Sequence, residues 1–156
     1  MKRITLSSDF SIKNLMTNRA IDKNCGRFSI AKHEMPANSS RHSHFDLFLE
    51  SEGTLMTWEL TSLLTTQNNQ VVRRLANHRL VYLDFQGPLS DDRGTVKLVD
   101  TGSLEWVTLE SERLISRING QTTDGILTLT SEGSSINDVW NLTFEPVVLT
   151  PQSSLD

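Results

Sequence analysis

Short stretches of strand-forming residues, separated by turn-forming residues, recur along most of this chain of 156 residues. In the clearest stretch, residues 44–49, apolar and polar side chains alternate as they do in a strand with one buried face. Similar stretches span residues 27–31, 54–60, 79–85, 95–99, 104–109, 125–130 and 139–144, and most are bounded by Gly, Pro, Asn or Asp. Many short strands at this spacing predict a mainly β fold, either an antiparallel barrel or a sandwich.

The length predicts one domain with a substantial core. We expect an N-terminal extension over residues 1–24, the β domain over 25–149 and a C-terminal tail over 150–156. Two weak helical signals lie at 60–67 and 69–75. Residues 100–102 read Asp-Thr-Gly, the triplet of aspartic proteases, but no second copy exists, so we predict a hairpin turn there.

Charge and composition exclude some classes of protein. The net charge of −4 argues against non-specific coating of nucleic acid, although a local basic pocket for one phosphate remains compatible with it. No apolar run approaches membrane-spanning length, and residues 1–16 contain no stretch of secretory type. Cys25 is the single cysteine, so an internal disulfide is impossible. The simplest prediction is a cytoplasmic protein that does not enter a membrane.

Three of the four histidines lie close together, between His33 and His44. In a strand, His42, His44 and Asp46 would project from one face, and the opposite face would be mostly apolar. Two imidazoles and a carboxylate are suitable ligands for a divalent metal. Spacing alone also fits a solvated strand face that carries histidines by chance.

Two segments together carry a family resemblance. The first contains His33, then His44-Phe45-Asp46-Leu47-Phe48-Leu49-Glu50, then Gly53 and Trp58. The second reads His78-x-x-x-Tyr82-x-Asp84-Phe85-x-Gly87 and is followed by Gly94-Thr95-Val96. In order and spacing these motifs resemble the 3′-phosphoesterase domain of bacterial DNA ligase D. The ordered match covers about residues 27–106, and a weaker likeness continues to residue 144.

The resemblance implies a single compact antiparallel β-barrel with a few short helices and a metal-dependent activity on nucleic-acid 3′ ends. Such domains remove a terminal ribonucleoside and then the 3′-phosphate. By residue correspondence, His33, His44 and Asp46 would bind the metal, which is expected to be Mn²⁺, with Zn²⁺ as the alternative. His78 would act in phosphoryl transfer, and Tyr82 would orient the phosphate.

The chain also departs from the family pattern. Where the family has His-x-Asp-x-Arg, this chain has Phe48 in place of the arginine, and phenylalanine cannot hold a phosphate. The segment before His44 is several residues longer than usual, so His42 is an alternative third metal ligand. Arg79 and Arg93 are the first candidates for a relocated phosphate-binding cation.

The sequence therefore leaves three functions open. One is a divergent phosphoesterase, a hydrolase that acts on DNA or RNA–DNA 3′ ends in DNA repair, with a ligase or polymerase supplied in trans. The second is a catalytically inactive β-barrel that keeps a metal or phosphate pocket and binds nucleic-acid ends or a protein. The third is an interaction module without a metal. Whether the protein is an enzyme stays open because of Phe48.

Overall fold

The computed structural model describes residues 24–132 and 138–148. Its elements, in chain order, are β1 (Cys25–Glu34), β2 (His44–Ser51), β3 (Thr54–Leu60), β4 (Asn68–His78), the 3₁₀ helix η1 (Leu80–Leu83), β5 (Gly87–Pro88), β6 (Thr95–Leu109), β7 (Arg113–Gly120), β8 (Asp124–Ser131) and β9 (Val139–Pro146). The predicted tail 150–156 and all of the predicted N-terminal extension except Asn24 lie outside the described residues. No described helix is long and apolar enough to cross a membrane.

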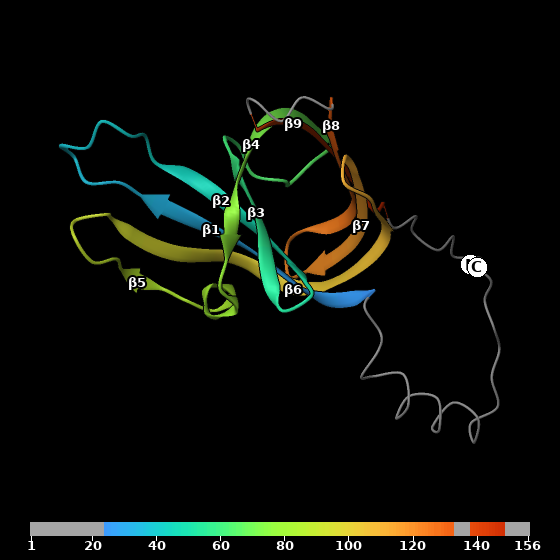
Figure 1. Cartoon of the computed structure of the whole chain (residues 1–156), viewed down its shortest axis with the longest axis horizontal. Helices are drawn as coiled ribbons and strands as arrows, with labels where there is room; N and C mark the ends of the chain where they lie inside the picture. Colours follow the sequence, from blue (N-terminus) through green and yellow to red (C-terminus); the bar gives the residue numbers. More distant parts are fainter. Residues whose placement is uncertain (1–23, 133–137, 149–156) are drawn as a thin grey trace, which may run out of the picture.

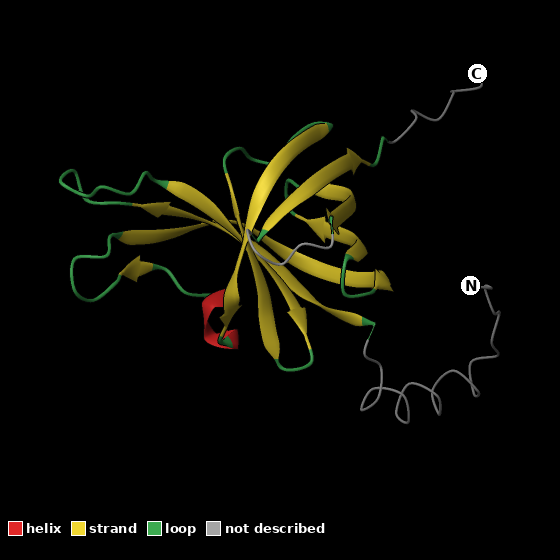
Figure 2. Cartoon of the chain, turned by 45° about the horizontal axis from the view of Figure 1, so that its top comes forward, coloured by secondary structure: helices red, strands yellow, loops and turns green. Residues whose placement is uncertain are grey.

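Eight of the strands close into an antiparallel barrel in the order β1-β2-β3-β4-β9-β8-β7-β6, and β6 pairs with β1 to complete it. The short β5 pairs with β6 outside the closed barrel. Among the described residues, closure leaves no long unpaired edge that could recruit another strand. Figures 1 and 2 show that β1, β2 and β6 also extend to one side as an arm, with η1 below its base. The predicted mainly β barrel is confirmed.

Several local predictions were wrong. Residues 79–85 contain η1 rather than a strand, and residues 95–109 form one strand, so the Asp-Thr-Gly triplet lies inside β6 and not in a turn. The helical signals at 60–67 and 69–75 were wrong too: a loop follows β3, and 69–75 belongs to β4, where pairing with β3 and β9 outweighs helix propensity. The strand β7 was missed because arginine, serine and asparagine interrupt its apolar pattern.

Side chains from every strand of the barrel fill its interior. The largest is Trp58, whose indole ring meets Trp140 edge-on at 5.7 Å between ring centroids. In β2, Leu47 and Leu49 point into this core, as the alternation in the sequence predicted. A second apolar cluster lies between the barrel wall and η1 and consists of Ala31, Phe48, Leu55, Leu83 and Val96. The wall at β1–β3 is therefore packed on both faces.

Asp100 fixes the turn between β7 and β8 from its position in β6. Its buried carboxylate accepts hydrogen bonds from the backbone N–H groups of Gln121, Thr122 and Thr123 at 2.7 to 3.0 Å. Burial by itself raises the pKa of Asp100. The hydrogen bonds lower the pKa by more than burial raises it, so the pKa lies below the ordinary value of 3.8. The triplet thus has a structural role.

We predict that Asp100→Asn lowers the free energy of unfolding at pH 7 by about 1–3 kcal/mol, because an amide offers the three N–H donors fewer acceptor sites. The folded-state pKa is depressed, so the contribution of the carboxylate is complete above pH 3.8 and disappears as the pH falls through the folded-state pKa. Urea unfolding at pH 7 and at about pH 2 should show the difference shrinking. The exposed Asp91→Asn is the control, and a pH-independent difference would contradict the prediction.

Candidate metal centre

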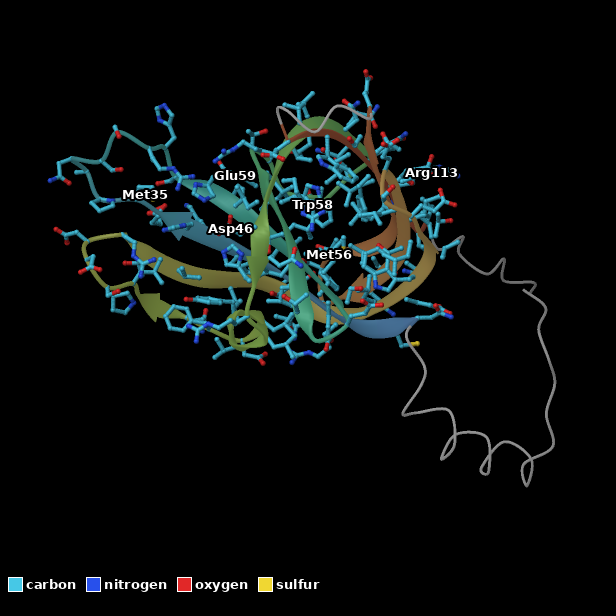
Figure 3. All side chains as sticks on the ribbon, viewed as in Figure 1. Met35, Asp46, Met56, Trp58, Glu59 and Arg113 are labelled. Carbon is cyan, nitrogen blue, oxygen red and sulfur yellow. The ribbon has the colours of Figure 1, made fainter. Side chains whose placement is uncertain are left out.

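The candidate centre lies on the outer face of the barrel wall, at the base of the arm. The antiparallel pairing of β1 and β2 sets His33 directly opposite His44 and Ala31 opposite Asp46. Cross-strand partners share a face, so both imidazoles and the carboxylate point the same way. One ligand atom from each of His33, His44 and Asp46 lies within 4.8 Å of the others. Figure 3 labels Asp46 in this region.

Backbone carbonyls fix which nitrogen of each imidazole is available. The Nδ1 of His44 lies 3.0 Å from the carbonyl oxygen of His42, and the Nε2 of His33 lies 2.7 Å from that of Arg93. A carbonyl only accepts hydrogen bonds, so each of these nitrogens carries the proton of the neutral ring. The other nitrogen of each ring, His44 Nε2 and His33 Nδ1, therefore has a lone pair that faces Asp46. This is the arrangement in which histidine binds metals.

The buried carboxylate of Asp46 carries a negative charge that no cation or hydrogen-bond donor among the described residues balances at Oδ1. Asp46 is 7% exposed, and its Oδ1 receives no hydrogen bond although it lies 3.3 Å from His44 Nε2. His33 Nδ1 lies 3.8 Å from Oδ2. Lone pairs that face a carboxylate repel it unless a cation lies between them. These three residues therefore fit a divalent metal with a His-His-carboxylate ligand set.

A proton on His44 can also balance the negative charge of Asp46. A hydrogen bond from protonated His44 to Asp46 raises the pKa of His44 above 6.5; burial opposes this shift, and the bond to the His42 carbonyl reinforces it. A proton and a metal ion would therefore compete for His44 Nε2.

His42, the alternative third ligand, is exposed and lies outside the group formed by His33, His44 and Asp46. The extra residues between β1 and β2 form a loop, and the two strands still pair up to the His33–His44 position. His42 contributes its carbonyl to the orientation of His44 instead.

The group formed by His33, His44 and Asp46 opens into a cavity of about 430 Å³. Besides His33, His44 and Asp46, its walls include Met35, Arg41, Phe48, Arg73, Leu75, His78, Tyr82, Leu89, Arg93 and Val96. His78 Nδ1 lies 2.9 Å from the Ala76 carbonyl, so the neutral ring has its lone pair on Nε2. The His78 ring lies 5.3 Å from Phe48 and 5.6 Å from Tyr82 between centroids. The two predicted motifs therefore meet in one cavity.

The predicted phosphate-binding arginines occupy different positions. Arg93 lines the cavity, but its guanidinium donates to the carbonyl and hydroxyl oxygens of Ser90, both at 2.9 Å. Arg79 is absent from the cavity walls and precedes η1, where its guanidinium lies 5.9 Å from the centroid of the Tyr82 ring.

An ion pair joins the end of η1 to the barrel. Arg27 in β1 forms two hydrogen bonds with Asp84, at 2.6 and 3.1 Å. Asp84 belongs to the second motif, and the guanidinium beside it lowers the pKa of its carboxyl group. Leu83 is buried beneath the same turn. Burial of Leu83 holds η1 against the barrel and so positions Tyr82 beside His78, and the solvent-exposed pair adds little to this.

Glu59 was not recognised from the sequence. It lies in β3 directly opposite Asp46, with Oε2 4.0 Å from His44 Nδ1. Its Oε1 lies 3.0 Å from Arg41 and 3.5 Å from Arg73. The two-residue turn at Glu52 and Gly53 sets the register of β2 and β3, which places Asp46 opposite Glu59. No short turn joins β3 to β4, so the sequence contained no signal that Arg73 would lie opposite Glu59.

Residues 32–143, more than half of the chain, match the family model described as the DNA ligase D 3′-phosphoesterase domain. No curated protein matches the chain.

We predict that the protein binds one Mn²⁺ and that His44→Ala and Asp46→Ala each weaken binding by about a hundredfold, because each removes a ligand atom. His33→Ala should weaken it comparably, and the exposed His42→Ala should not. Titration calorimetry at pH 7.5 measures the affinities, with circular dichroism as a check on folding. If His42→Ala lost as much affinity as His33→Ala, the assignment of the third ligand would be wrong.

Proposed function

Because the chain belongs to the DNA ligase D 3′-phosphoesterase family, we propose that it is a metal-dependent phosphoesterase acting on nucleic-acid 3′ ends. The observation that carries this proposal is the meeting of a His-His-Asp group with His78 and Tyr82 in a single cavity. Such an activity would serve DNA end processing and repair, alongside a ligase or polymerase.

In this proposal His33, His44 and Asp46 hold the metal ion, with Mn²⁺ preferred and Zn²⁺ as the alternative. A divalent ion bound there supplies Lewis-acid polarisation of a phosphoryl oxygen. The buried Asp46 brings negative charge to the ion, and the backbone carbonyls of His42 and Arg93 hold both rings in the ligating orientation.

His78 performs proton transfer in the reaction. Its Nδ1 is bonded to a backbone carbonyl, so Nε2 is the atom that exchanges a proton with the substrate or with water. Tyr82 lies next to it on η1, and its hydroxyl group donates a hydrogen bond to the phosphate. The aromatic contacts among His78, Tyr82 and Phe48 limit the movement of both rings.

Because of Phe48 we expect a slow enzyme. The same residue is the basis for a second candidate function, a barrel that binds 3′ ends without cleaving them. The Phe48 side chain is 3% exposed, lines the cavity and offers no hydrogen-bond donor. Loss of one charged donor to a phosphoryl group typically costs about a hundredfold or more in rate. A barrel with this substitution could also bind 3′ ends without cleaving them, and the turnover experiment below separates the two functions.

The purified protein, incubated with Mn²⁺ and a primer–template that carries a labelled 3′-phosphate, is expected to release phosphate. A second substrate with a single 3′-ribonucleotide tests end trimming. Asp46→Ala and His78→Ala should lower turnover by about a hundredfold or more, because they remove a metal ligand and the proton-transfer group. His42→Ala is the matched control. Absence of product from the wild-type protein at high concentration would leave the inactive binding module as the function.

Phe48→Arg is expected to raise the rate of 3′-phosphate release by about tenfold or more, because a guanidinium on this face of β2 can bind the phosphate through two parallel hydrogen bonds. Single-turnover kinetics with excess enzyme measures the effect. Phe48→Leu is the matched control, since it changes the same side chain without adding a donor. Equal rates for the two variants would mean that the cavity no longer uses a cation at this position.

A further inference from the structure

We infer that Arg41 and Arg73, joined by Glu59, form a relocated phosphate grip that takes over from the arginine replaced by Phe48. This inference rests on the proposed function, because it names the residues that would hold the terminal phosphate. Both arginines line the cavity that contains His33, His44 and Asp46.

The pairing of β2, β3 and β4 places Arg73 on the same face of the sheet as Asp46. Asp46 in β2 pairs with Glu59 in β3, and Glu59 pairs with Arg73 in β4. Residues that pair across strands share a face, and neighbouring strands lie about 4.8 Å apart. Arg73 is therefore two strands from Asp46 on the outer face of the barrel, and a long side chain can reach back across Glu59.

Arg41 reaches the same carboxylate from the loop between β1 and β2. The loop is held by its own hydrogen bonds: Ser39 N–H donates to the Pro36 carbonyl, Arg41 N–H to Ser39 Oγ and Met35 N–H to Ser43 Oγ, each at 3.0 Å. The extra loop residues, which lengthen the first motif, therefore bring a cation to the cavity. Figure 3 shows Met35 in the arm and Glu59 near Asp46.

The three charged side chains leave an excess of positive charge. Two guanidinium groups share one carboxylate, and the contact with Glu59 uses a single nitrogen of each. A guanidinium has five N–H donors, so both arginines keep donors for a further anion. Their side chains are 50% and 56% exposed, which leaves them accessible to a substrate.

The other arginines near the cavity are less suitable, because Arg93 uses two of its three guanidinium nitrogens on Ser90 and Arg79 is not among the cavity walls. Arg93 donates to Ser90, and Arg79 lies over the Tyr82 ring. Arg74 points into the barrel, where its guanidinium lies 4.7 Å from the centroid of the Trp58 ring. Arg41 and Arg73 are therefore the cations in the described part of the chain that best suit the phosphate.

The test compares two oligonucleotides that differ only at the 3′ end, one with a phosphate and one with a hydroxyl group. Fluorescence anisotropy without added metal measures the ratio of their affinities for the wild-type protein, Arg41→Met, Arg73→Met and Arg113→Met. Arg113 lies at the other end of the barrel from Asp46 and controls for lost charge (Figure 3). Thermal unfolding shows which variants fold, and the exposed Arg41 keeps the test valid if Arg73→Met does not.

The wild-type protein and Arg113→Met should prefer the 3′-phosphate by about tenfold, from charge-assisted hydrogen bonds to the guanidinium groups. Arg41→Met and Arg73→Met should lose most of this preference and keep their affinity for the 3′-hydroxyl end. An unchanged preference, or an equal loss for both ends, would overturn the grip. A wild-type protein that shows no preference but turns over the 3′-phosphate substrate overturns the grip alone; no preference and no turnover together overturn the proposed function as well.

Discussion

The pairing of β1 with β2 in the register that sets His33 opposite His44 is the constraint on which the rest of the structure depends. Side chains alternate along β2, so Leu47 and Leu49 fill the barrel while His44 and Asp46 face outward. A slip of one residue would bury the carboxylate among leucines and expose the core. The hydrophobic effect that closes the barrel therefore also orients the candidate metal ligands.

Electrostatics at the centre follow from this geometry. Two imidazoles are turned by backbone carbonyls so that their lone pairs meet a buried carboxylate. The arrangement is unfavourable without a positive charge and becomes favourable with a metal ion or a proton. Next to Asp46 lies the second carboxylate, Glu59, which forms ion pairs with Arg41 and Arg73. Negative side chains on β2 and β3 are therefore followed by positive side chains on β4 and in the loop before β2. The proposed metal ion and the proposed phosphate group would each meet the part of this surface with the opposite charge.

The second apolar cluster explains how an outer face can carry a shaped cavity. Phe48, Leu55 and Leu83 pack between the barrel wall and η1, and the Arg27–Asp84 pair joins η1 to β1. This covering segment presents Tyr82 next to His78. Phe48 belongs to the packing of this region as well as to the cavity wall. Its substitution for an arginine therefore adds apolar contact where the family pattern has a charge.

The sequence by itself determined the β class of the fold, the two faces of β2 and the motifs that identify the family, because these depend on local alternation and on short spacings. It could not determine the conformation of residues 79–85, since η1 depends mainly on the burial of Leu83 against distant strands. The helical signal in β4 failed for a similar reason: strand partners on both sides outweigh a weak propensity. Only the tertiary structure brought His33 rather than His42 to Asp46 and placed Glu59 between Arg41 and Arg73. The two-residue turn at Glu52 and Gly53 fixes the β2–β3 register locally. The β1–β2 and β3–β4 registers, which bring His33 and Arg73 to this face, span longer loops, so packing and hydrogen bonding between the strands decide them.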